Sequence, residues 1–266
     1  MRAGRSGRRR WLRDYGGPAL TIAGLVLAWE VGVAAARVPI WLLPPPTAIV
    51  AALWAWRGQA PRHTWATLYE VLGGFVLAIA IGLPLAVAIV YSPFVRRVTY
   101  PVLLVFQSIP KVALAPLLLL YLGYGIQTNI TVAAIVAFFP IVVNTVTGLE
   151  SVEPELLQLA RFLDAGALRV FWKVRLPWAL PHIFSALKVA VSLAVIGAVV
   201  GEFVGSDRGL GYAIVTASSS MNTSLVFGIM GLLALMGIAV FYAVWLVEML
   251  ACPWYQPPPD ADRPTL

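Results

Sequence analysis

The sequence predicts an all-α integral membrane protein with six transmembrane helices and an amphipathic cytoplasmic helix between the fourth and the fifth. Of its 266 residues, 60% are apolar and only 12% are charged, about half the share of charge that soluble domains carry. The apolar residues form blocks of roughly 20 residues, the length that crosses the hydrocarbon core as a helix. These blocks are continuous, whereas the strands of a membrane β-barrel would alternate.

Six blocks are long enough to span a membrane. They cover residues 18–36, 66–91, 99–122, 126–148, 183–204 and 225–250. Glycine, proline and a few charged residues interrupt them, as in GGFVLAIAIGLP and FQSIPKVALAP. Such interruptions are tolerated in helices that face a protein interior or line a path, so a conduit is favoured over a simple anchor. Between the first two blocks, Thr47 follows three prolines and is a candidate cap of a short helix.

The basic residues indicate which side of the membrane each connection faces. Six arginines precede residue 18, two lie in residues 92–98, four basic residues lie in residues 149–182, and Arg263 is near the end. The opposite connections hold far fewer, among them Arg57, Arg62 and Arg208. Because basic residues are enriched in cytoplasmic loops, we expect a multi-pass protein of the cell (inner or plasma) membrane with both termini cytoplasmic.

The two ends of the chain differ in composition from the membrane domain. Residues 1–16 are a basic cytoplasmic tail, residues 17–250 the six-helix domain, and the proline-rich residues 251–266 a tail expected to be disordered. Arginines, an apolar run and the small residues 34–36 together resemble a secretory signal. The apolar run is longer than the roughly 7–15 residues of a signal core, so we expect the first helix to remain.

The chain lacks the residues that catalytic or metal chemistry requires. Cys252, His63 and His182 are far apart in the sequence and cannot predict a metal-ligand cluster. None of the three lysines follows a glycine, so a phosphate-binding Gly-Lys-Ser/Thr motif is absent. The serines 218–220 have no neighbouring base to activate them. We therefore expect no enzyme activity and no cofactor in this chain.

The stretch LLQLARFLDAGALRVFWKVRLPWALP, residues 156–181, separates two apolar blocks and carries four basic residues. As a helix it would place small and apolar residues on one face, namely Leu156, Leu159, Ala160, Leu163 and Ala167. Pro177 and Pro181 are expected to stop this helix before the next span. An amphipathic helix of this kind either lies on lipid head groups or docks on a soluble partner.

This stretch resembles the cytoplasmic loop of the permease subunits of ATP-binding-cassette importers, whose pattern is E-A-A, three residues, G, nine residues, I-x-L-P. The matching positions are Gln158-Leu159-Ala160, Asp164, Val174 and Leu176-Pro177. Gln158, Leu159 and Asp164 depart from the pattern, and Gly166 follows two positions after Asp164. The resemblance implies a coupling helix between the fourth and fifth spans, with ATPase-coupling residues Gln158, Ala160, Leu163, Asp164, Ala165, Gly166 and Pro177.

Two further stretches extend the resemblance to about residues 15–250. FQSIPKVALAPLLLLYLGYG and LAVIGAVVGEFVGSDRGLGYAI look like the branch of this family that imports nitrate, sulfonates, taurine, bicarbonate and thiamine precursors. PKVALAP with GAVVGEFVGSDRGLGY is most similar to members assigned to pyrimidine thiamine precursors or riboflavin. Aromatic residues that could stack on such a planar cargo are Phe106, Tyr121, Tyr124, Phe138 and Phe139.

The resemblance also implies partners. A second copy or homologue of the permease would complete the path through the membrane lipid, and a cytoplasmic ATP-binding-cassette ATPase dimer would hold ATP and Mg²⁺. An extracytoplasmic substrate-binding protein would deliver the cargo, and nucleic acid is not an expected partner. Closure of the ATPase, transmitted by the coupling helix, would switch the path between two states. The alternatives are an importer of sulfonate-, taurine- or nitrate-type anions, and a self-contained channel or secondary carrier.

Lys111 is the most unusual residue of the spans. It lies about twelve residues into the block 99–122, or roughly 18 Å along a helix, where a charge costs at least about 2.5 kcal/mol. We expect it to pair with Glu202, with Glu30 or Glu248 as alternatives, or to contact the cargo. Other polar residues that bond neighbouring helices or line the path are Gln107, Ser108 and Asn144.

The stretch GSDRGLGY, which follows Glu202 closely, contains Gly205, Gly209 and Gly211. Three glycines in seven residues suit a tight turn, because glycine adopts backbone conformations that other residues avoid. No strand precedes the stretch, so a phosphate-binding loop is not favoured. We expect an outer gate or a docking site for the binding protein.

Overall fold

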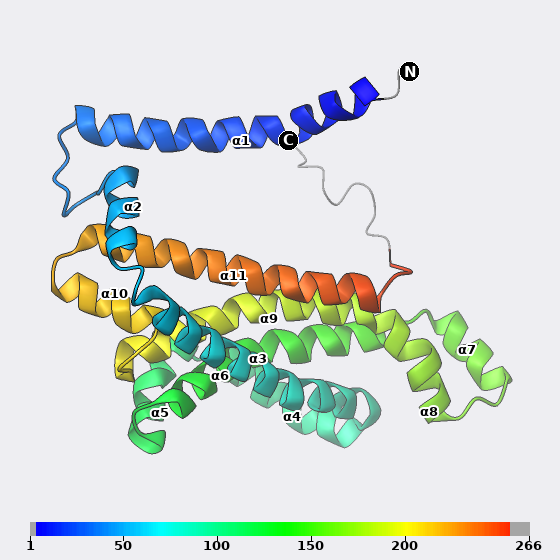
Figure 1. Ribbon diagram of the computed structural model, residues 1–266. Coiled ribbons are helices and arrows are strands. Elements are labelled where there is room, and N and C mark those ends of the chain that lie inside the picture. The colour runs from blue at the N-terminus through cyan, green and yellow to red at the C-terminus, as the bar shows by residue number, and fades with distance from the viewer. Residues whose placement is uncertain (1–3, 256–266) are drawn as a thin grey trace. The chain divides into compact units, whose positions relative to one another are not determined.

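The computed structural model describes residues 4–255, and these residues are helical over most of their length (Figure 1). Contacts divide the chain into two compact units. The first comprises Met1–Pro61 and Ala213–Leu232, and the second Arg62–Tyr212 and Leu233–Leu266. Within the described residues no strand occurs, which confirms the all-α membrane fold class.

The first unit contains α1 (Gly4–Ala35), α2 (Pro46–Ala55) and parts of α10 (Leu210–Ser219) and α11 (Thr223–Ala251). Helix α1 begins at Gly4 and therefore includes most of the expected N-terminal tail. The expectation that Thr47 caps α2 is wrong, because that helix begins at Pro46. Instead, the Thr47 amide and hydroxyl donate to the Glu30 carboxylate at 3.1 and 2.7 Å. The carboxylate thus satisfies an amide of the first turn, which has no partner inside the helix.

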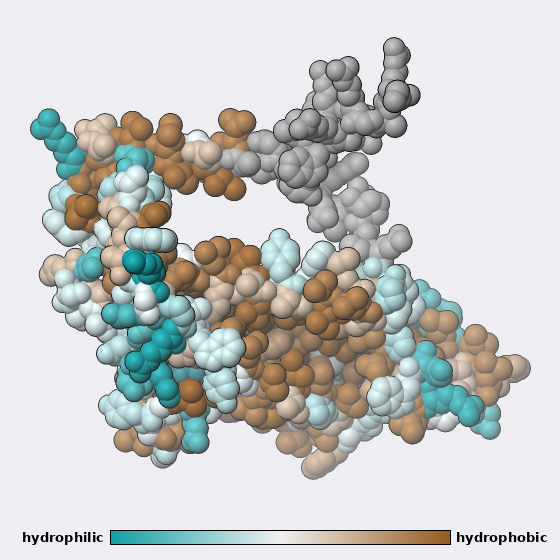
Figure 2. Space-filling view, in the orientation of Figure 1, coloured by the Kyte–Doolittle hydropathy of each residue, from teal (hydrophilic) through white to brown (hydrophobic). Residues whose placement is uncertain are grey.

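The second unit contains the remaining helices. They are α3 (Ala60–Tyr91), α4 (Pro93–Ser108), a short 3₁₀ turn η1 (Lys111–Leu114), α5 (Ala115–Leu122), α6 (Ile126–Glu150), α7 (Pro154–Phe162), α8 (Ala167–Val170), a π turn η2 (Phe171–Arg175) and α9 (Leu176–Gly205). Figure 1 shows α3, α6 and α9 running side by side. Figure 2 shows hydrophobic side chains over much of the length of this bundle, as expected for helices that face lipid.

The described residues do not confirm the exact count of six spans. Among the described residues, four helical segments are long and apolar enough to cross a membrane: Ala60–Tyr91, Ile126–Glu150, Ala167–Gly205 and Thr223–Ala251. Pro93–Ser108 with Lys111–Leu122 adds a fifth if this bent pair counts as one span. The apolar part of α1, Leu20–Ala35, is shorter than a full span.

The expected continuous helix over residues 99–122 is broken, and its two parts meet at 90°. The break falls at Ile109 and Pro110, whose ψ angles are 129° and 99°. A residue that precedes proline is disfavoured in the helical region, and proline cannot donate a backbone hydrogen bond. The depth of Lys111 therefore cannot be counted along one straight helix.

The expected single helix from residue 156 to the prolines is also wrong. Helix α7 ends at Phe162, and a second helical stretch begins at Ala167 and continues through the π turn into α9. Pro177 lies in the first turn of α9 and Pro181 lies inside it, so neither stops a helix. Proline is tolerated in the first helical turn, where the amide that it lacks would have no helical acceptor.

Small residues let the three central helices approach closely. A Cβ atom added to Gly74 of α3 would collide with Ala133 of α6, and one added to Gly197 of α9 would lie 2.7 Å from the Ala133 Cα atom. One added to Gly201 would lie 2.7 Å from the Asn129 side chain. Small residues at such contacts are typical of packed membrane helices, where backbone proximity replaces hydrophobic burial as the source of stability.

Candidate functional site

The α7–α8 segment, which we define as residues 154–170, projects from one end of the second unit (Figure 1). Its tip is apolar. Phe162 is 88% exposed and Leu163 is 67% exposed, and Leu159 and Leu168 are exposed beside them. A cluster of exposed apolar side chains, flanked by charged ones, is typical of a surface that contacts another protein.

The turn at Asp164 explains the departure from the glycine of the family pattern. The Asp164 amide donates to the Arg161 carbonyl at 3.0 Å, and the Ala165 amide donates to the Ala160 carbonyl at 2.9 Å. These two bonds form a Schellman motif, which needs a left-handed residue after the helix end. Asp164 is that residue, with φ of 52°. Glycine is favoured there because it has no Cβ, and aspartate is among the residues that tolerate this conformation.

Replacing Asp164 with glycine is therefore expected to stabilise the chain by about 0.5–1 kcal/mol, because the left-handed backbone no longer carries a Cβ atom. Asp164→Ala is the matched control and is expected to destabilise, since alanine keeps the Cβ and loses the polar side chain. Thermal unfolding of the detergent-solubilised protein measures both. A glycine variant less stable than the alanine variant would contradict this account.

The other expected coupling residues differ in exposure. Gln158 and Gly166 are exposed, Ala160 is buried, and Ala165 and Pro177 are half-buried. The exposed members lie beside the apolar tip, whereas Ala160 packs inward. The structure thus brings most of these residues to one end of the bundle, although Pro177 belongs to α9.

The base of the α7–α8 segment is fixed to the bundle. The Arg175 guanidinium donates to the Leu149 carbonyl at 2.8 Å, which links η2 to the end of α6. Leu149, Ala179 and Ile183 form a buried cluster at the same place. Residues just before and just after the segment are therefore packed together, while its tip stays exposed.

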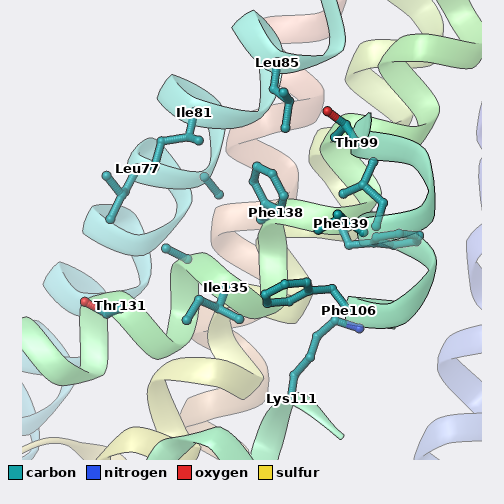
Figure 3. Close-up of a pocket in the computed structure, with 14 residues that line it drawn as sticks. Leu77, Ile81, Leu85, Thr99, Phe106, Lys111, Thr131, Ile135, Phe138 and Phe139 are labelled. Carbon is teal, nitrogen blue, oxygen red and sulfur yellow. The ribbon is translucent and has the colours of Figure 1, made fainter. Parts of the chain in front are cut away.

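An apolar cavity of about 410 Å³ lies in the second unit (Figure 3). Its walls come from α3, α4, η1 and α6, and its labelled lining residues are Leu77, Ile81, Leu85, Thr99, Phe106, Lys111, Thr131, Ile135, Phe138 and Phe139. Lys111 is the only charged residue among those that line it. The Lys111 Nζ atom lies 5.5 Å from the centre of the Phe139 ring, a cation–π contact.

Three of the five aromatic residues expected to stack on a planar cargo line this cavity, namely Phe106, Phe138 and Phe139. Tyr121 and Tyr124 do not, and each is 81% exposed. The break at Ile109 and Pro110 directs the chain so that Lys111 lies at the cavity beside Phe106. A ligand in this cavity would meet aromatic faces and one ammonium group.

Two of the three polar residues expected to bond neighbouring helices or line the path bond their own helices instead. The Ser108 hydroxyl donates to the Leu104 carbonyl at 3.2 Å, and the Asn144 amide donates to the Pro140 carbonyl at 2.9 Å. Gln107, Ser108 and Asn144 are all exposed in the isolated subunit. None of the three lines the cavity.

The expected ion pair between Lys111 and Glu202 is wrong. Lys111 lies over Phe139, while the Glu202 carboxylate binds Thr67 and Gly211. The two alternative partners are also engaged elsewhere. Glu30 accepts from Thr47 within the first unit, and Glu248 of α11 pairs with Lys188 of α9 at 2.7 Å.

The observed Lys188–Glu248 pair gives a double-mutant test. Lys188→Met strands a largely buried carboxylate, which typically costs about 3–5 kcal/mol, whereas adding Glu248→Gln removes both charges and should restore part of the loss. Thermal unfolding of the two single variants and the double variant measures the coupling. Strictly additive losses would show that the two side chains do not stabilise each other.

A network of buried hydrogen bonds surrounds Glu202, near the end of α9. The Thr67 hydroxyl donates to Glu202 Oε1 at 2.6 Å, and the Gly211 amide donates to Oε2. The Leu210 amide donates to the Thr67 oxygen at 2.7 Å. This arrangement attaches the turn between α9 and α10 to α3.

The three glycines expected at an outer gate are all closely packed. Gly209 has φ of 110°, and a Cβ on Gly209 or Gly211 would collide with the Glu202 carboxyl group. A Cβ on Gly205 would collide with the Leu119 side chain of α5. The tight turn expected from the sequence is present, and its glycines leave room for a carboxylate.

Glu70 makes a separate buried hydrogen bond between helices, and the sequence reasoning missed it. Its Oε1 atom accepts from the Asn129 side-chain amide at 2.9 Å, which joins α3 to α6. Glu70 is 1% exposed. The signal was a glutamate inside an apolar block, since an ionisable residue within a span is rare and usually functional.

Comparison with known proteins gives one family. Residues 74–251 match the family described as "Binding-protein-dependent transport system inner membrane component". The chain is 36% identical over 255 residues to the riboflavin transport system permease protein RibX of Chloroflexus aurantiacus, covering 94% of this chain and 95% of that protein. It is 34% identical over 238 residues to the formylaminopyrimidine transport permease protein ThiX of Halalkalibacterium halodurans, covering 89% and 95% respectively.

The fold is similar to a solved structure. An inward-facing structure of the MetNI methionine ABC transporter matches with a TM-score of 0.61 and 23% identity, covering 70% of this chain and 93% of the matched chain. At this identity the likeness concerns the fold alone.

Proposed function

Since this chain belongs to the family of binding-protein-dependent transport system inner membrane components and is the permease subunit of an ATP-binding-cassette importer, we propose that its cargo is a small planar aromatic nutrient. A pyrimidine precursor of thiamine is the first candidate, and riboflavin is the second. The two relatives compared above carry names of these two cargo classes.

The cavity beside Lys111 is the observation that carries this proposal. Its volume of about 410 Å³ is in the range of small-molecule sites, and its lining is apolar except for a few polar groups. The rings of Phe106, Phe138 and Phe139 offer stacking faces to a planar cargo. The Lys111 ammonium has three donors and could bind a ring nitrogen or carbonyl oxygen of the cargo.

An anionic cargo is the second candidate, because Lys111 also offers one fixed positive charge. Sulfonate and nitrate ions accept several hydrogen bonds from water, and an apolar wall does not replace the hydrogen bonds that they would lose. A site for them would be expected to hold more donors than the lining provides. Because the lining offers aromatic rings and few hydrogen-bond donors, it favours the aromatic cargo.

The α7–α8 segment is proposed as the coupling element that docks on the ATPase. The exposed apolar tip at Phe162, Leu163 and Leu168 supports this role. The charged flank with Arg161 and Arg169 supports an interface with a soluble protein rather than with lipid tails alone. A substrate-binding protein outside and a second permease subunit, either a copy or a homologue, complete the proposed assembly.

Uptake by reconstituted vesicles tests the cargo. The vesicles contain this subunit with its ATPase and binding protein, and each assay offers one labelled compound: a thiamine-precursor pyrimidine, riboflavin, taurine or nitrate. We expect ATP-dependent accumulation of the pyrimidine or of riboflavin. Accumulation of taurine or nitrate alone would overturn the cargo assignment and leave the permease assignment intact.

A variant pair tests the cavity within the same assay. Phe139→Leu removes a stacking face and is expected to lower uptake about tenfold, the effect of roughly 1.4 kcal/mol, which is near the upper value of an aromatic pair. Tyr121→Leu is the matched control, since this exposed aromatic residue lies outside the cavity. Equal uptake by both variants would show that the cavity does not hold the cargo.

A further inference from the structure

A second cavity, of about 330 Å³, lies at the end of the second unit away from the α7–α8 segment. The start of α3, the first residue of α6 and the turn between α9 and α10 form its walls, with Arg62, Trp65, Ala66, Tyr69, Ile126 and Arg208 as lining residues. The two arginines are the charged members of this lining, and no carboxylate is among the described residues that form it. The cavity therefore combines positive charge with aromatic surface.

Contacts between α3 and the turn after α9 hold the two arginines at one place. The His63 Nδ1 atom lies 3.0 Å from the Gly209 carbonyl oxygen and 3.2 Å from the Gly209 amide nitrogen. The His63 ring also stacks on Tyr212, with 6.1 Å between the ring centres. Arg62 and Arg208 each directly precede one of these two contacting residues. The arginine pair thus belongs to a fixed part of the fold, although its members are distant in the sequence.

The charge of the two arginines is largely uncompensated within residues 4–255. Arg208 has Asp207 as an ion-pair partner at 3.8 Å, but the Asp207 side chain is 89% exposed, and an exposed pair at this distance is weak. No described carboxylate forms an ion pair with Arg62. A guanidinium presents five donors in a planar fork that matches the oxygens of a phosphate group. Two guanidinium groups at one cavity therefore favour a phosphate.

An apolar stripe leads from this cavity along α3 into the span. We define it by Trp65, Tyr69, Leu72 and Val76, which follow one another at intervals of four, three and four residues and so share one face of the helix. All four are exposed, Trp65 by 70% and Tyr69 by 55%. From Trp65 to Val76 the helix extends about 16 Å, close to the roughly 15 Å of hydrocarbon in one leaflet. The stripe thus has the length of a lipid chain.

The length of α3 places the arginines at the depth of the lipid head groups. Its 32 residues extend about 48 Å, whereas the hydrocarbon core is about 30 Å thick. If the helix is centred, about 9 Å, or roughly six residues, lie outside the hydrocarbon at each end. Arg62 and Trp65 fall within these first six residues of α3. Tryptophan is enriched at this depth because its ring is apolar and its N–H is polar.

We propose that this cavity and the apolar stripe bind one anionic phospholipid. Arg62 and Arg208 hold its phosphate, Trp65 and Tyr69 lie where the head group meets the acyl chains, and one chain follows the stripe to Val76. A soluble protein docked on the arginines would not reach Val76, which lies within the span, whereas a lipid contacts both the charged and the apolar part. The proposal is independent of the cargo and of the coupling role.

Native mass spectrometry of the assembled transporter in detergent tests the arginines. The probes are dioleoylphosphatidylglycerol, which is anionic, and dioleoylphosphatidylcholine, which carries no net charge. We expect one tightly bound phosphatidylglycerol for each copy of this chain, in preference to phosphatidylcholine. The double variant Arg62→Gln with Arg208→Gln should bind phosphatidylglycerol about twentyfold more weakly, roughly fivefold for each arginine. Arg57→Gln is the matched control, since this exposed arginine lies outside the cavity lining.

A tryptophan pair tests the apolar part of the site in the same experiment. Trp65→Ala removes the first side chain of the stripe and is expected to weaken phosphatidylglycerol binding about tenfold. Trp54→Ala is its control, because Trp54 is similarly exposed, at 69%, and does not line the cavity. Inorganic phosphate at the same concentration as the lipid should not displace it, because phosphate has no acyl chain to contact the stripe.

Several results would overturn the proposal. Unchanged phosphatidylglycerol affinity in the double arginine variant would show that the two arginines do not hold the head group, and displacement of the lipid by inorganic phosphate would show a simple anion site. If the double variant loses the binding protein but keeps the lipid, the arginines contact that protein instead. Should the double variant not fold, the parent decides, since equal binding of the two lipids contradicts recognition of charge. Lipid bound by the separate chain but absent from the assembled transporter would show that the stripe is a contact between subunits.

Discussion

Leu163→Asp and Ala165→Arg are each expected to reduce ATP-dependent uptake at least tenfold while the chain still accumulates in the membrane. Leu163 directly follows the last residue of α7 and is 67% exposed, so it lies where the ATPase is proposed to dock. Ala165 closes the Schellman turn beside it. An unpaired charge buried at a packed contact costs several kcal/mol, and each 1.4 kcal/mol is a factor of ten in affinity.

Co-purification of the ATPase with the tagged permease measures the contact, and vesicle uptake measures its consequence. Leu163→Met is the matched control, because it keeps an apolar side chain of similar size and should leave both measurements near the parent values. Undiminished co-purification of the ATPase with both charged variants would show that the α7–α8 segment is not the docking element.

Gly197→Val is expected to destabilise the chain by at least about 3 kcal/mol and to remove most of the folded protein from the membrane. A Cβ at this position lies 2.7 Å from the Ala133 Cα atom and 3.1 Å from its backbone nitrogen. Because the obstacle is backbone, no side-chain rotation relieves the collision, and α6 and α9 must separate.

Gly231→Val is the matched control for this change. Gly231 also lies in a long apolar helix, and no atom lies within 4 Å of a Cβ built there. The comparison therefore isolates helix contact from helix propensity. Size-exclusion profiles and thermal unfolding of both variants measure the difference, and a Gly197→Val protein as stable as Gly231→Val would contradict the close packing.

The sequence predicts the long helices well because hydropathy averages over many residues. Blocks 66–91, 126–148, 183–204 and 225–250 correspond to α3, α6, α9 and α11. The blocks 18–36 and 99–122 do not give complete straight spans. In the second of these, Pro110 signals an interruption, but proline permits both a slight kink and a right-angle turn. Tertiary packing decides between them.

The sites were predictable to different degrees. The glycine-rich turn after α9 was foreseen because Gly209 needs a positive φ angle, which is a local property of the chain. The pairing of Lys111 was not, because the partner of a side chain in a span depends on how each helix is rotated about its axis. Glu70 carried no motif, and its hydrogen bond to Asn129 became visible only when α3 was placed against α6.

Because α6 packs against α9 along its length, a movement at the base of the α7–α8 segment would be transmitted along both helices. The two helices touch near Gly148 and His182 at the base and again near Asn129 and Gly201 at the other end. From Asn129 to Gly148 the helix extends about 29 Å at 1.5 Å per residue. If the pair moves as one rigid rod, a tilt of about 5° at the base displaces the Asn129 end by about 2.5 Å over that length. That shift exceeds the range of donor–acceptor distances in a hydrogen bond. A small displacement of the α7–α8 segment would then be enough to break or form contacts of Asn129 at the far end of α6.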